Sequence, residues 1–344
     1  MKALFKVDGL PGLQLLDTPV PAVRDDDVLI RVHSTGICGT DVHIYQWDAW
    51  AQRHVTAPLV VGHEFVGEVV ETGRHVSGFR PGDLVGGEGH LVCGRCRDCR
   101  EGHAHHCAHT RGLGIHHHGA FAEYLALPAT NVWRHNEGTS PDAAVLFDPL
   151  GNAVHTAGVF PVLGEDVLVT GAGPIGIMTA MVAERLGANS VTLADVSEFR
   201  VGLARDMGVR RALDVRDLTP GSGRGFGVAL ETSGAAAAVR QAVELLAHGG
   251  KLAALGLPPQ DVPVDWSTLV LKSIAVQGVY GRRMFATWRE TSSLIDNGLD
   301  VAPVITHRFP FTQFTDAFAT AAGRTCGKVV MQWHDDGRSR PHIP

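Results

Sequence analysis

Long apolar segments and dense basic clusters are both missing from this chain of 344 residues. No run of about 18 apolar residues occurs, which argues against a membrane-spanning helix. The N-terminus, Met1 to Lys6, lacks the apolar run and small-residue cleavage site of a signal peptide. The 30 Lys and Arg against 36 Asp and Glu give a net charge of -6, so nucleic-acid binding is not expected. We therefore expect a cytoplasmic protein that binds neither nucleic acid nor membrane.

Cysteine is also scarce, and four of the six cysteines lie within a short segment. A disulfide framework belongs to a short secreted chain, whereas in a reducing compartment such clustering indicates a metal. Cys93, Cys96, Cys99 and Cys107 can complete the four-thiolate shell of a structural zinc ion. An iron–sulfur cluster is the alternative, because C-x2-C-x2-C begins the ferredoxin pattern. No cysteine here precedes a proline, as that pattern requires, so zinc is favoured.

The length of the chain, and the change in its pattern of apolar runs along the sequence, predict two domains. With 44% hydrophobic and 19% charged residues, the composition is that of a globular protein. Residues 1–150 contain short apolar runs broken by Pro and Gly, which predicts a small β-barrel-like domain. Residues 151–290 alternate strand-like runs with Ala-rich helical runs, which predicts an α/β fold with a doubly wound parallel sheet. Residues 291–344 are expected to return to the first domain.

A candidate catalytic metal site begins at Cys38, in Gly-Ile-Cys-Gly-Thr-Asp-Val-His. His63 and Glu64 follow 25 residues later and add an imidazole and a carboxylate. Three such ligands with one open position are typical of catalytic zinc. Because successive side chains on a strand point to opposite faces, His63 and Glu64 can bind one ion only if the backbone turns between strands there. Glu64 is therefore either a ligand or a neighbour of the ligands.

A glycine-rich loop predicts a dinucleotide site in the second domain. Gly171, Gly173 and Gly176 form G-x-G-x-x-G after a predicted strand and before a predicted helix. The glycines permit a tight turn and close approach of a pyrophosphate to the helix N-terminus. Asp195 ends the next strand and can accept hydrogen bonds from an adenosine ribose, which favours NAD. Arg200 leaves NADP open, because an Arg nearby can accommodate a 2′-phosphate.

These patterns, in this order, resemble the zinc-dependent medium-chain alcohol dehydrogenases. Within that family, five blocks are most similar to the members that oxidise L-threonine, namely residues 37–45, 61–64, 87–90, 147–156 and 305–309. The resemblance implies a GroES-like catalytic domain with a structural-zinc lobe at about 88–110, followed by a Rossmann domain. It also implies a homotetramer with one catalytic and one structural zinc ion per subunit, which converts L-threonine and NAD to 2-amino-3-oxobutanoate.

The resemblance also implies roles for individual residues. Cys38, His63 and Glu64 would hold the catalytic zinc, and Thr40 and His43 would relay the substrate proton. Asp148 would lie near the metal and support the relay. The positions expected to line the cofactor cleft, beside the glycine loop, are Ile175, Leu255, Gly256, Leu257, Val279 and Tyr280.

Two other functions are open at this point. A zinc-dependent polyol or secondary-alcohol dehydrogenase would have the same metal and NAD sites, and relative rates on threonine and sorbitol would separate the two. A zinc-binding NAD sensor without activity would form no NADH with any alcohol. Nothing in the spacing indicates which residues bind the ammonium and carboxylate of threonine.

Overall fold

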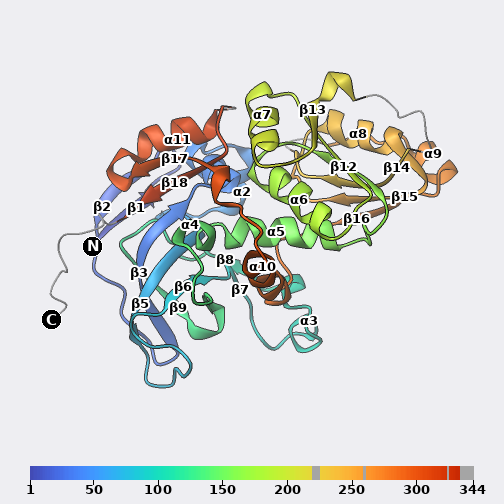
Figure 1. Ribbon diagram of the computed structural model, residues 1–344. Coiled ribbons are helices and arrows are strands. Elements are labelled where there is room, and N and C mark those ends of the chain that lie inside the picture. Colours follow the sequence, from blue (N-terminus) through green and yellow to red (C-terminus); the bar gives the residue numbers. More distant parts are fainter. Residues whose placement is uncertain (219–224, 259–260, 324, 334–344) are drawn as a thin grey trace.

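The computed structural model describes residues 1–218, 225–258, 261–323 and 325–333, so the end of the predicted segment 291–344 lies outside the described residues. The chain forms two bodies that share no sheet (Figure 1). None of the helices in these described ranges is long and apolar enough to cross a membrane.

The first body contains a seven-stranded sheet with the order β10-β6-β5-β3-β18-β17, in which β9 also pairs with β3, and a three-stranded sheet β2-β1-β4. Its strands are β1 (Lys2–Lys6), β2 (Gln14–Asp17), β3 (Asp27–Gly36), β4 (Leu59–Val60), β5 (Glu64–Thr72), β6 (Leu84–Gly87), β9 (Tyr124–Pro128), β10 (Val132–Arg134), β17 (Ile305–Pro310) and β18 (Lys328–Gln332). Its helices are α1 (Gly39–Gln46), α2 (Ala49–His54), α4 (Pro141–Ala144) and α11 (Phe314–Ala322). The late strand β18 lies beside β3, so the end of the chain completes a sheet begun at its start.

The second body contains six parallel strands in the order β13-β12-β11-β14-β15-β16. The strands are β11 (Asp166–Thr170), β12 (Ser190–Asp195), β13 (Arg211–Asp214), β14 (Phe226–Glu231), β15 (Leu246–Ala254) and β16 (Ala275–Gly278). The connecting helices are α6 (Pro174–Arg185), α7 (Glu198–Asp206), α8 (Ala236–Leu245) and α9 (Trp266–Leu271). The predicted doubly wound α/β arrangement is confirmed, and its central strands are almost entirely apolar because helices cover both faces.

Two helices lie where the bodies meet, α5 (Phe147–Gly158) and α10 (Ala286–Asp296) (Figure 1). One continuous apolar core runs from the parallel sheet through α5 to Val66 and Val330 of the other sheet. The predicted boundaries at 150 and 290 fall within α5 and α10, and their positions stay predictions.

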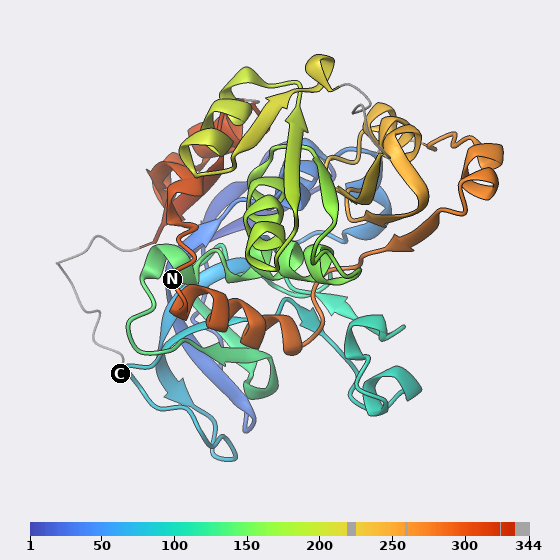
Figure 2. The ribbon, with the colours of Figure 1, turned by 45° about the vertical axis from the view of Figure 1, so that its right-hand side comes forward.

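A small lobe projects from the first body (Figure 2). It contains β7 (His90–Leu91), α3 (Arg97–Arg100) and β8 (Arg111–Gly112). Few of its side chains are buried, so apolar packing alone contributes little to its stability.

A buried histidine beside α5 makes stability depend on pH. Both ring nitrogens of His135 lack hydrogen-bond partners in the described structure, the ring packs edge-on against Phe147, and burial lowers the pKa of His135 to about 4. The unfolded chain binds a proton near pH 6.5, so this histidine opposes folding increasingly as the pH falls from 6.5 to 4. We expect His135→Leu to reduce the stability lost between pH 7.5 and pH 5 by about 2 kcal/mol. Denaturant unfolding at both pH values measures this, and an equal loss in both proteins would contradict it.

Candidate functional site

The three residues predicted to bind the catalytic metal lie together. Cys38, His63 and Glu64 each offer one ligand atom, and these atoms lie within 4.8 Å of one another. Cys38 follows β3 and precedes α1, while His63 precedes β5. The backbone turns at Gly62, whose φ of 94° is in the left-handed region, and Phe121 occupies the space a side chain would need there. Because of this turn His63 lies outside regular strand geometry, which lets its ring face the same point as the Glu64 carboxylate.

A buried aspartate holds two of these residues in place. Asp41 Oδ2 accepts the backbone N–H of Cys38 at 2.8 Å, and Oδ1 lies 3.5 Å from Nδ1 of His63. Asp41 is fully buried, so its charge acts on His63 with little screening. Burial opposes protonation of the ring, but the nearby Asp41 and Cys38 outweigh it and raise the pKa of His63. Asp41 thereby aims the other ring nitrogen of His63 toward Cys38, as a carboxylate behind a metal-binding histidine does.

The Glu64 carboxylate is paired with a buried lysine. Lys328 Nζ, on β18, donates to both oxygens of Glu64 at 2.8 and 2.7 Å and also to the carbonyl of Ile37 at 3.2 Å. Burial opposes the ammonium charge, but Glu64 outweighs this effect and raises the pKa of Lys328. Glu64 therefore stands beside Cys38 and His63 as a carboxylate whose charge is already balanced. Its role, as a ligand or as a neighbour of the ligands, stays a prediction.

A second buried ion-pair network adjoins the metal residues. Arg282 donates from Nη2 and Nε to Glu88 at 2.6 and 3.0 Å, and from Nη1 to Asp148 Oδ1 at 2.6 Å. Trp288 Nε1 and the His90 ring also contact Glu88, at 2.9 and 2.6 Å. Glu88, Arg282 and Asp148 expose 4% or less of their surfaces. This network ties the Asp148 side chain of α5 to the segment that follows β16.

One oxygen of Asp148 has no hydrogen bond in the described structure. This Oδ2 atom is buried and lies next to Gly89, which also approaches His63 and carries no side chain to separate them. An unpaired buried carboxylate oxygen is costly unless a cation or donor approaches it. The geometry therefore favours a bound metal ion or a donor group of a substrate on the His63 side of Asp148.

The predicted proton-relay residues lie on α1. Thr40 and His43 are three residues apart, so they share one face of the helix. Thr40 is half-buried and the His43 side chain is 48% exposed. Their roles as a proton relay stay a prediction.

The lobe brings the four clustered cysteines into the arrangement of a metal site. The sulfurs of Cys93, Cys96, Cys99 and Cys107 lie within 4.8 Å of one another. Cys96 and Cys99 are 3.4 Å apart and Cys93 and Cys107 are 3.7 Å apart. Thiolates about 2.3 Å from a tetrahedral zinc ion would lie about 3.8 Å apart, so the cluster fits that ion.

The acidities of these thiols also favour a cation. Backbone N–H groups of Arg95 and Cys96 lower the pKa of Cys93 to about 6. Burial and the neighbouring Cys96 raise the pKa of Cys99 to about 12. Four thiols this close cannot all ionise without a positive charge among them, and a divalent ion supplies it.

The glycine loop has the geometry that a pyrophosphate requires. Gly171 follows β11 with a φ of 94°, and Gly173 caps α6 with open space where a side chain would project. A side chain on Gly176 would overlap the carbonyl of Gly171, so only glycine lets the helix approach the strand. The N-terminus of α6, a helix of 12 residues, thus faces an accessible loop.

Asp195 lies at the carboxyl end of β12, beside this loop. Its carboxylate accepts the backbone N–H of Ala172 at 2.6 Å and that of Ser197 at 2.8 Å. These contacts leave further lone pairs for a ribose diol. Arg200 follows on α7 but donates from Nε to the carbonyl of Cys326 at 3.4 Å. Arg200 thus contacts the C-terminal segment of the chain.

The other positions predicted for the cofactor lie at the same edge of the sheet. Leu255, Gly256 and Leu257 follow β15, Val279 and Tyr280 follow β16, and Ile175 lies in the first turn of α6. The carboxyl edge of a parallel sheet is where such sheets bind dinucleotides. Sequence reasoning missed Glu231, at the end of β14, which accepts the N–H groups of Ser233 and Gly234 and so shapes the neighbouring loop.

We expect Asp195→Ala to weaken NAD binding at least about tenfold, because a charged hydrogen-bond acceptor contributes about 1.5–3 kcal/mol. Discrimination against NADP should fall as well, because the carboxylate that repels a 2′-phosphate is gone. Calorimetric titration with both nucleotides measures these effects. Asp195→Asn, which keeps an acceptor for one of the two N–H groups, helps to separate lost ribose contact from a disturbed loop. Unchanged NAD affinity in both variants would contradict the ribose role.

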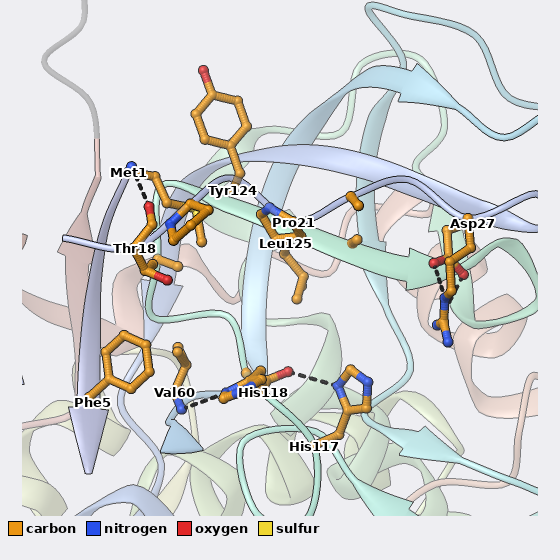
Figure 3. A pocket seen from close by; sticks show the side chains of 16 residues that line it. Met1, Phe5, Thr18, Pro21, Asp27, Val60, His117, His118, Tyr124 and Leu125 are labelled. Atoms are coloured by element: carbon orange, nitrogen blue, oxygen red, sulfur yellow. Dashed lines mark hydrogen bonds and ion pairs between the residues drawn. The ribbon is translucent and has the colours of Figure 1, made fainter. Parts of the chain in front are cut away.

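A cavity of about 300 Å³ lies elsewhere, between the N-terminus, β9 and the His117–His118 turn (Figure 3). Its walls are largely apolar, with Phe5, Pro21 and Leu125 among them. None of the residues predicted for the metal, the relay or the cofactor lines it. The cavity is therefore separate from the candidate site.

Sequence reasoning missed Asp41, Lys328 and Arg282 as parts of the site. A signal existed for each: Asp41 stands inside the Cys38 segment, Lys328 begins the otherwise apolar run Lys-Val-Val-Met, and Arg282 follows a predicted cofactor position. In each case the pairing depends on a contact that spacing does not disclose.

Family models match both bodies of the chain. Residues 24–137 match the model described as the alcohol dehydrogenase GroES-like domain, and residues 174–297 match the zinc-binding dehydrogenase model. An L-threonine 3-dehydrogenase of Saccharopolyspora erythraea is 54% identical over 97% of this chain and 99% of that protein. An L-threonine 3-dehydrogenase of Escherichia coli is 48% identical over 97% of this chain and all of that protein.

Solved structures share the arrangement of both bodies. A zinc-binding dehydrogenase of Sinorhizobium meliloti bound to NADP gives a TM-score of 0.89 at 27% identity, covering 96% of this chain and 99% of the other. An Escherichia coli alcohol dehydrogenase in complex with NADH gives 0.88 at 26% identity, covering 97% and 99%. The similarity therefore extends over nearly the whole fold, including the regions of the metal residues and the glycine loop.

Proposed function

Since the chain belongs to the zinc-binding medium-chain alcohol dehydrogenase family, we propose that it oxidises the 3-hydroxyl of L-threonine with NAD, forming 2-amino-3-oxobutanoate and NADH. The observation that carries this proposal is the grouping of Cys38, His63 and Glu64 beside the unpaired oxygen of Asp148. The two L-threonine 3-dehydrogenases named above are 54% and 48% identical to this chain over nearly their full lengths, which supports threonine as the substrate.

Zinc and NAD both fit the residues present. Cys38 and His63 would hold the catalytic zinc with Glu64 or Asp148 near its remaining positions, and the Gly171 loop with Asp195 would hold NAD. When bound, zinc supplies a Lewis acid for the substrate hydroxyl and NAD supplies a hydride acceptor. We assign NAD over NADP because the Asp195 carboxylate would repel a 2′-phosphate and Arg200 donates to the Cys326 carbonyl.

The chain's own residues provide the path for the substrate proton. Thr40 receives the hydroxyl proton and passes its own to His43, which releases it to solvent. Asp148, held by Arg282, keeps a negative charge near the reacting hydroxyl. Asp148 and Glu88 are buried together with their cation, Arg282. This burial excludes water, so their charges act in a medium of low dielectric constant.

Absorbance of NADH with L-threonine plus NAD tests the proposal. We expect turnover that is lost on chelation and restored by zinc, with sorbitol oxidised far more slowly. Faster oxidation of sorbitol would favour the polyol dehydrogenase instead. Absence of NADH formation with every alcohol tried would favour a protein that only binds zinc and NAD.

The proposed metal content is one catalytic and one structural zinc ion per subunit. The sulfur spacings in the lobe support the second ion. Elemental analysis should give two zinc ions per chain, and one in Cys99→Ser. A content of one in the unaltered protein would remove the structural ion from the proposal.

We also propose a homotetramer assembled partly through β16. Every residue of β16 is exposed, and one of its edges has no neighbouring strand among the described residues. Such an edge beside apolar side chains favours pairing with a second copy. The exposed apolar residues nearby are Leu257, Trp266, Val270, Leu271 and Val276, with exposed fractions between 53% and 78%. Light scattering should give a smaller mass for Val276→Lys than for Leu163→Lys, a matched change of another exposed apolar residue.

The proposed location is the cytoplasm. All six cysteines are free thiols, and the five placed at the two metal sites can serve as ligands only while reduced.

A further inference from the structure

His43 has a carboxylate partner that neither the sequence pattern nor the relay accounts for. Its Nδ1 lies 2.5 Å from Oδ2 of Asp48, the residue just before α2. The two side chains are 48% and 37% exposed, so the pair stands at the protein surface with one edge in contact with solvent. The Trp50 ring lies 5.9 Å from the His43 ring and screens another side of it.

The Asp48 carboxylate is itself immobilised. Its other oxygen, Oδ1, accepts the N–H groups of Trp50 and Ala51, both at 3.0 Å, and so caps α2. Partial burial opposes ionisation, but the Ala51 N–H and the His43 ring outweigh it and lower the pKa of Asp48. The carboxylate therefore presents Oδ2 to His43 as a charged acceptor in a fixed direction.

The turn between α1 and α2 is also fixed. Trp47 ends α1 in the left-handed region with a φ of 54°, which brings the chain back toward His43. The buried Lys6 lies over the Trp47 ring at 4.7 Å, and Lys6 is held by the carbonyls of Leu10 and Gly12. The nearby His54 ring stacks on Trp50 at 4.8 Å, and its Nδ1 lies 2.7 Å from the Trp50 carbonyl oxygen.

We infer that Asp48 is a positioning residue for the proton relay, which holds the His43 ring with Nδ1–H toward the carboxylate and leaves Nε2 as the proton acceptor. The inference rests on the proposed function. The substrate hydroxyl proton passes to Thr40 as the Thr40 proton passes to Nε2, while the carbon-bound hydrogen leaves with its electron pair to NAD. The resulting imidazolium is stabilised by Asp48 until it loses its proton to water.

Asp48→Asn is the informative substitution, because Asn caps a helix as well as Asp but carries no charge. We expect kcat with L-threonine to fall about 10- to 100-fold, as for loss of part of a general base, with the KM values for NAD and threonine within about twofold. In a His43→Gln background, which is itself slow, Asp48→Asn should cause no further loss. Asp48→Ser, which keeps a cap but is too short to reach the ring, should behave like Asp48→Asn. Asp142→Asn, a change of a surface aspartate paired with Arg308, should leave kcat unchanged.

A second measurement requires neither turnover nor bound zinc or NAD. Proton–nitrogen spectra of protein labelled at histidine should show Nδ1 of His43 protonated and Nε2 not, with the signals assigned by their absence in His43→Gln. Asp48→Asn should lose this pattern while retaining its thermal midpoint.

The outcomes are separable. Unchanged kcat in Asp48→Asn, or additive losses in the double variant, would overturn the inference while leaving the function intact. The same ring pattern in both proteins would overturn it as well. No turnover of L-threonine by the unaltered enzyme would instead overturn the proposed function and the relay with it.

Discussion

Replacing Cys38 by serine is expected to lower kcat/KM for L-threonine by about 10⁴-fold, while NAD affinity changes by less than about twofold. A Lewis acid contributes several kcal/mol to such a reaction, and about 5 kcal/mol corresponds to this factor. Without the thiolate, His63 is the one member of the trio Cys38, His63 and Glu64 that is left without a cationic partner, because Lys328 already binds Glu64. The glycine loop lies in the other body and keeps its contacts.

The control for this variant is Cys326→Ser. Cys326 is buried, and its sulfur lies 3.2 Å from the carbonyl of Thr320, which can accept a serine hydroxyl equally well. Zinc content should fall by about one ion per chain in Cys38→Ser and stay constant in Cys326→Ser. Normal turnover in Cys38→Ser would refute the assignment of this thiol as a ligand.

Arg282→Leu is expected to destabilise the protein by about 3–5 kcal/mol and to abolish turnover. The substitution leaves the carboxylates of Glu88 and Asp148 buried without their cation, which is the costly way to break a buried ion pair. Although burial raises it, Arg282 lowers the pKa of Glu88 far below its usual range, so this carboxylate remains charged at neutral pH. Thermal or denaturant unfolding gives the stability, and NADH formation gives the turnover.

Further substitutions show whether the effect comes from the whole network of Glu88, Arg282 and Asp148 or from the charge of Arg282 alone. Glu88→Gln combined with Arg282→Leu removes an anion along with the cation and should recover part of the lost stability. Arg282→Lys keeps one positive charge but cannot contact both carboxylates in the same way. Its turnover should therefore lie between that of the unaltered protein and that of Arg282→Leu. A thermal midpoint of Arg282→Leu equal to that of the unaltered protein would contradict the structural role of the network.

The fold was predictable from local patterns to a large extent. The run Asp-Val-Leu-Val-Thr-Gly followed by an Ala-rich helix specifies a buried parallel strand and its crossover, and the structure confirms the doubly wound sheet. The glycine loop was equally predictable, because each glycine is required locally, either for its backbone angle or for the close approach of two segments.

The metal residues were only partly predictable. The scarcity of cysteine and the short spacings singled out Cys38 and His63, and the structure brings them together. The arrangement at Glu64 depends on the turn at Gly62, whose conformation Phe121 enforces from a distant segment. The strand pattern therefore predicted that the side chains of His63 and Glu64 point in opposite directions, whereas in the structure both face the candidate metal position.

The ion pairs were not predictable, because their contacts depend on how the chain packs. Arg282 lies 194 residues from Glu88, and the sequence around either residue does not indicate its partner. The same holds for Asp48 and His43 at short range: five residues separate them, but their contact depends on the left-handed turn at Trp47. Sequence spacing indicates which chemistry is available, whereas only packing decides which charges meet.

The pairing of Lys328 with Glu64 also bears on biosynthesis. The two residues are separated by 264 positions, and β18 is the last described strand. During translation Cys38, His63 and Glu64 are synthesised first, and the Glu64 carboxylate has no access to the Lys328 counterion until the chain has been synthesised through β18. A prematurely terminated product that lacks β18 would retain every thiol and imidazole of the site and still be an inactive protein with an uncompensated acid in its core.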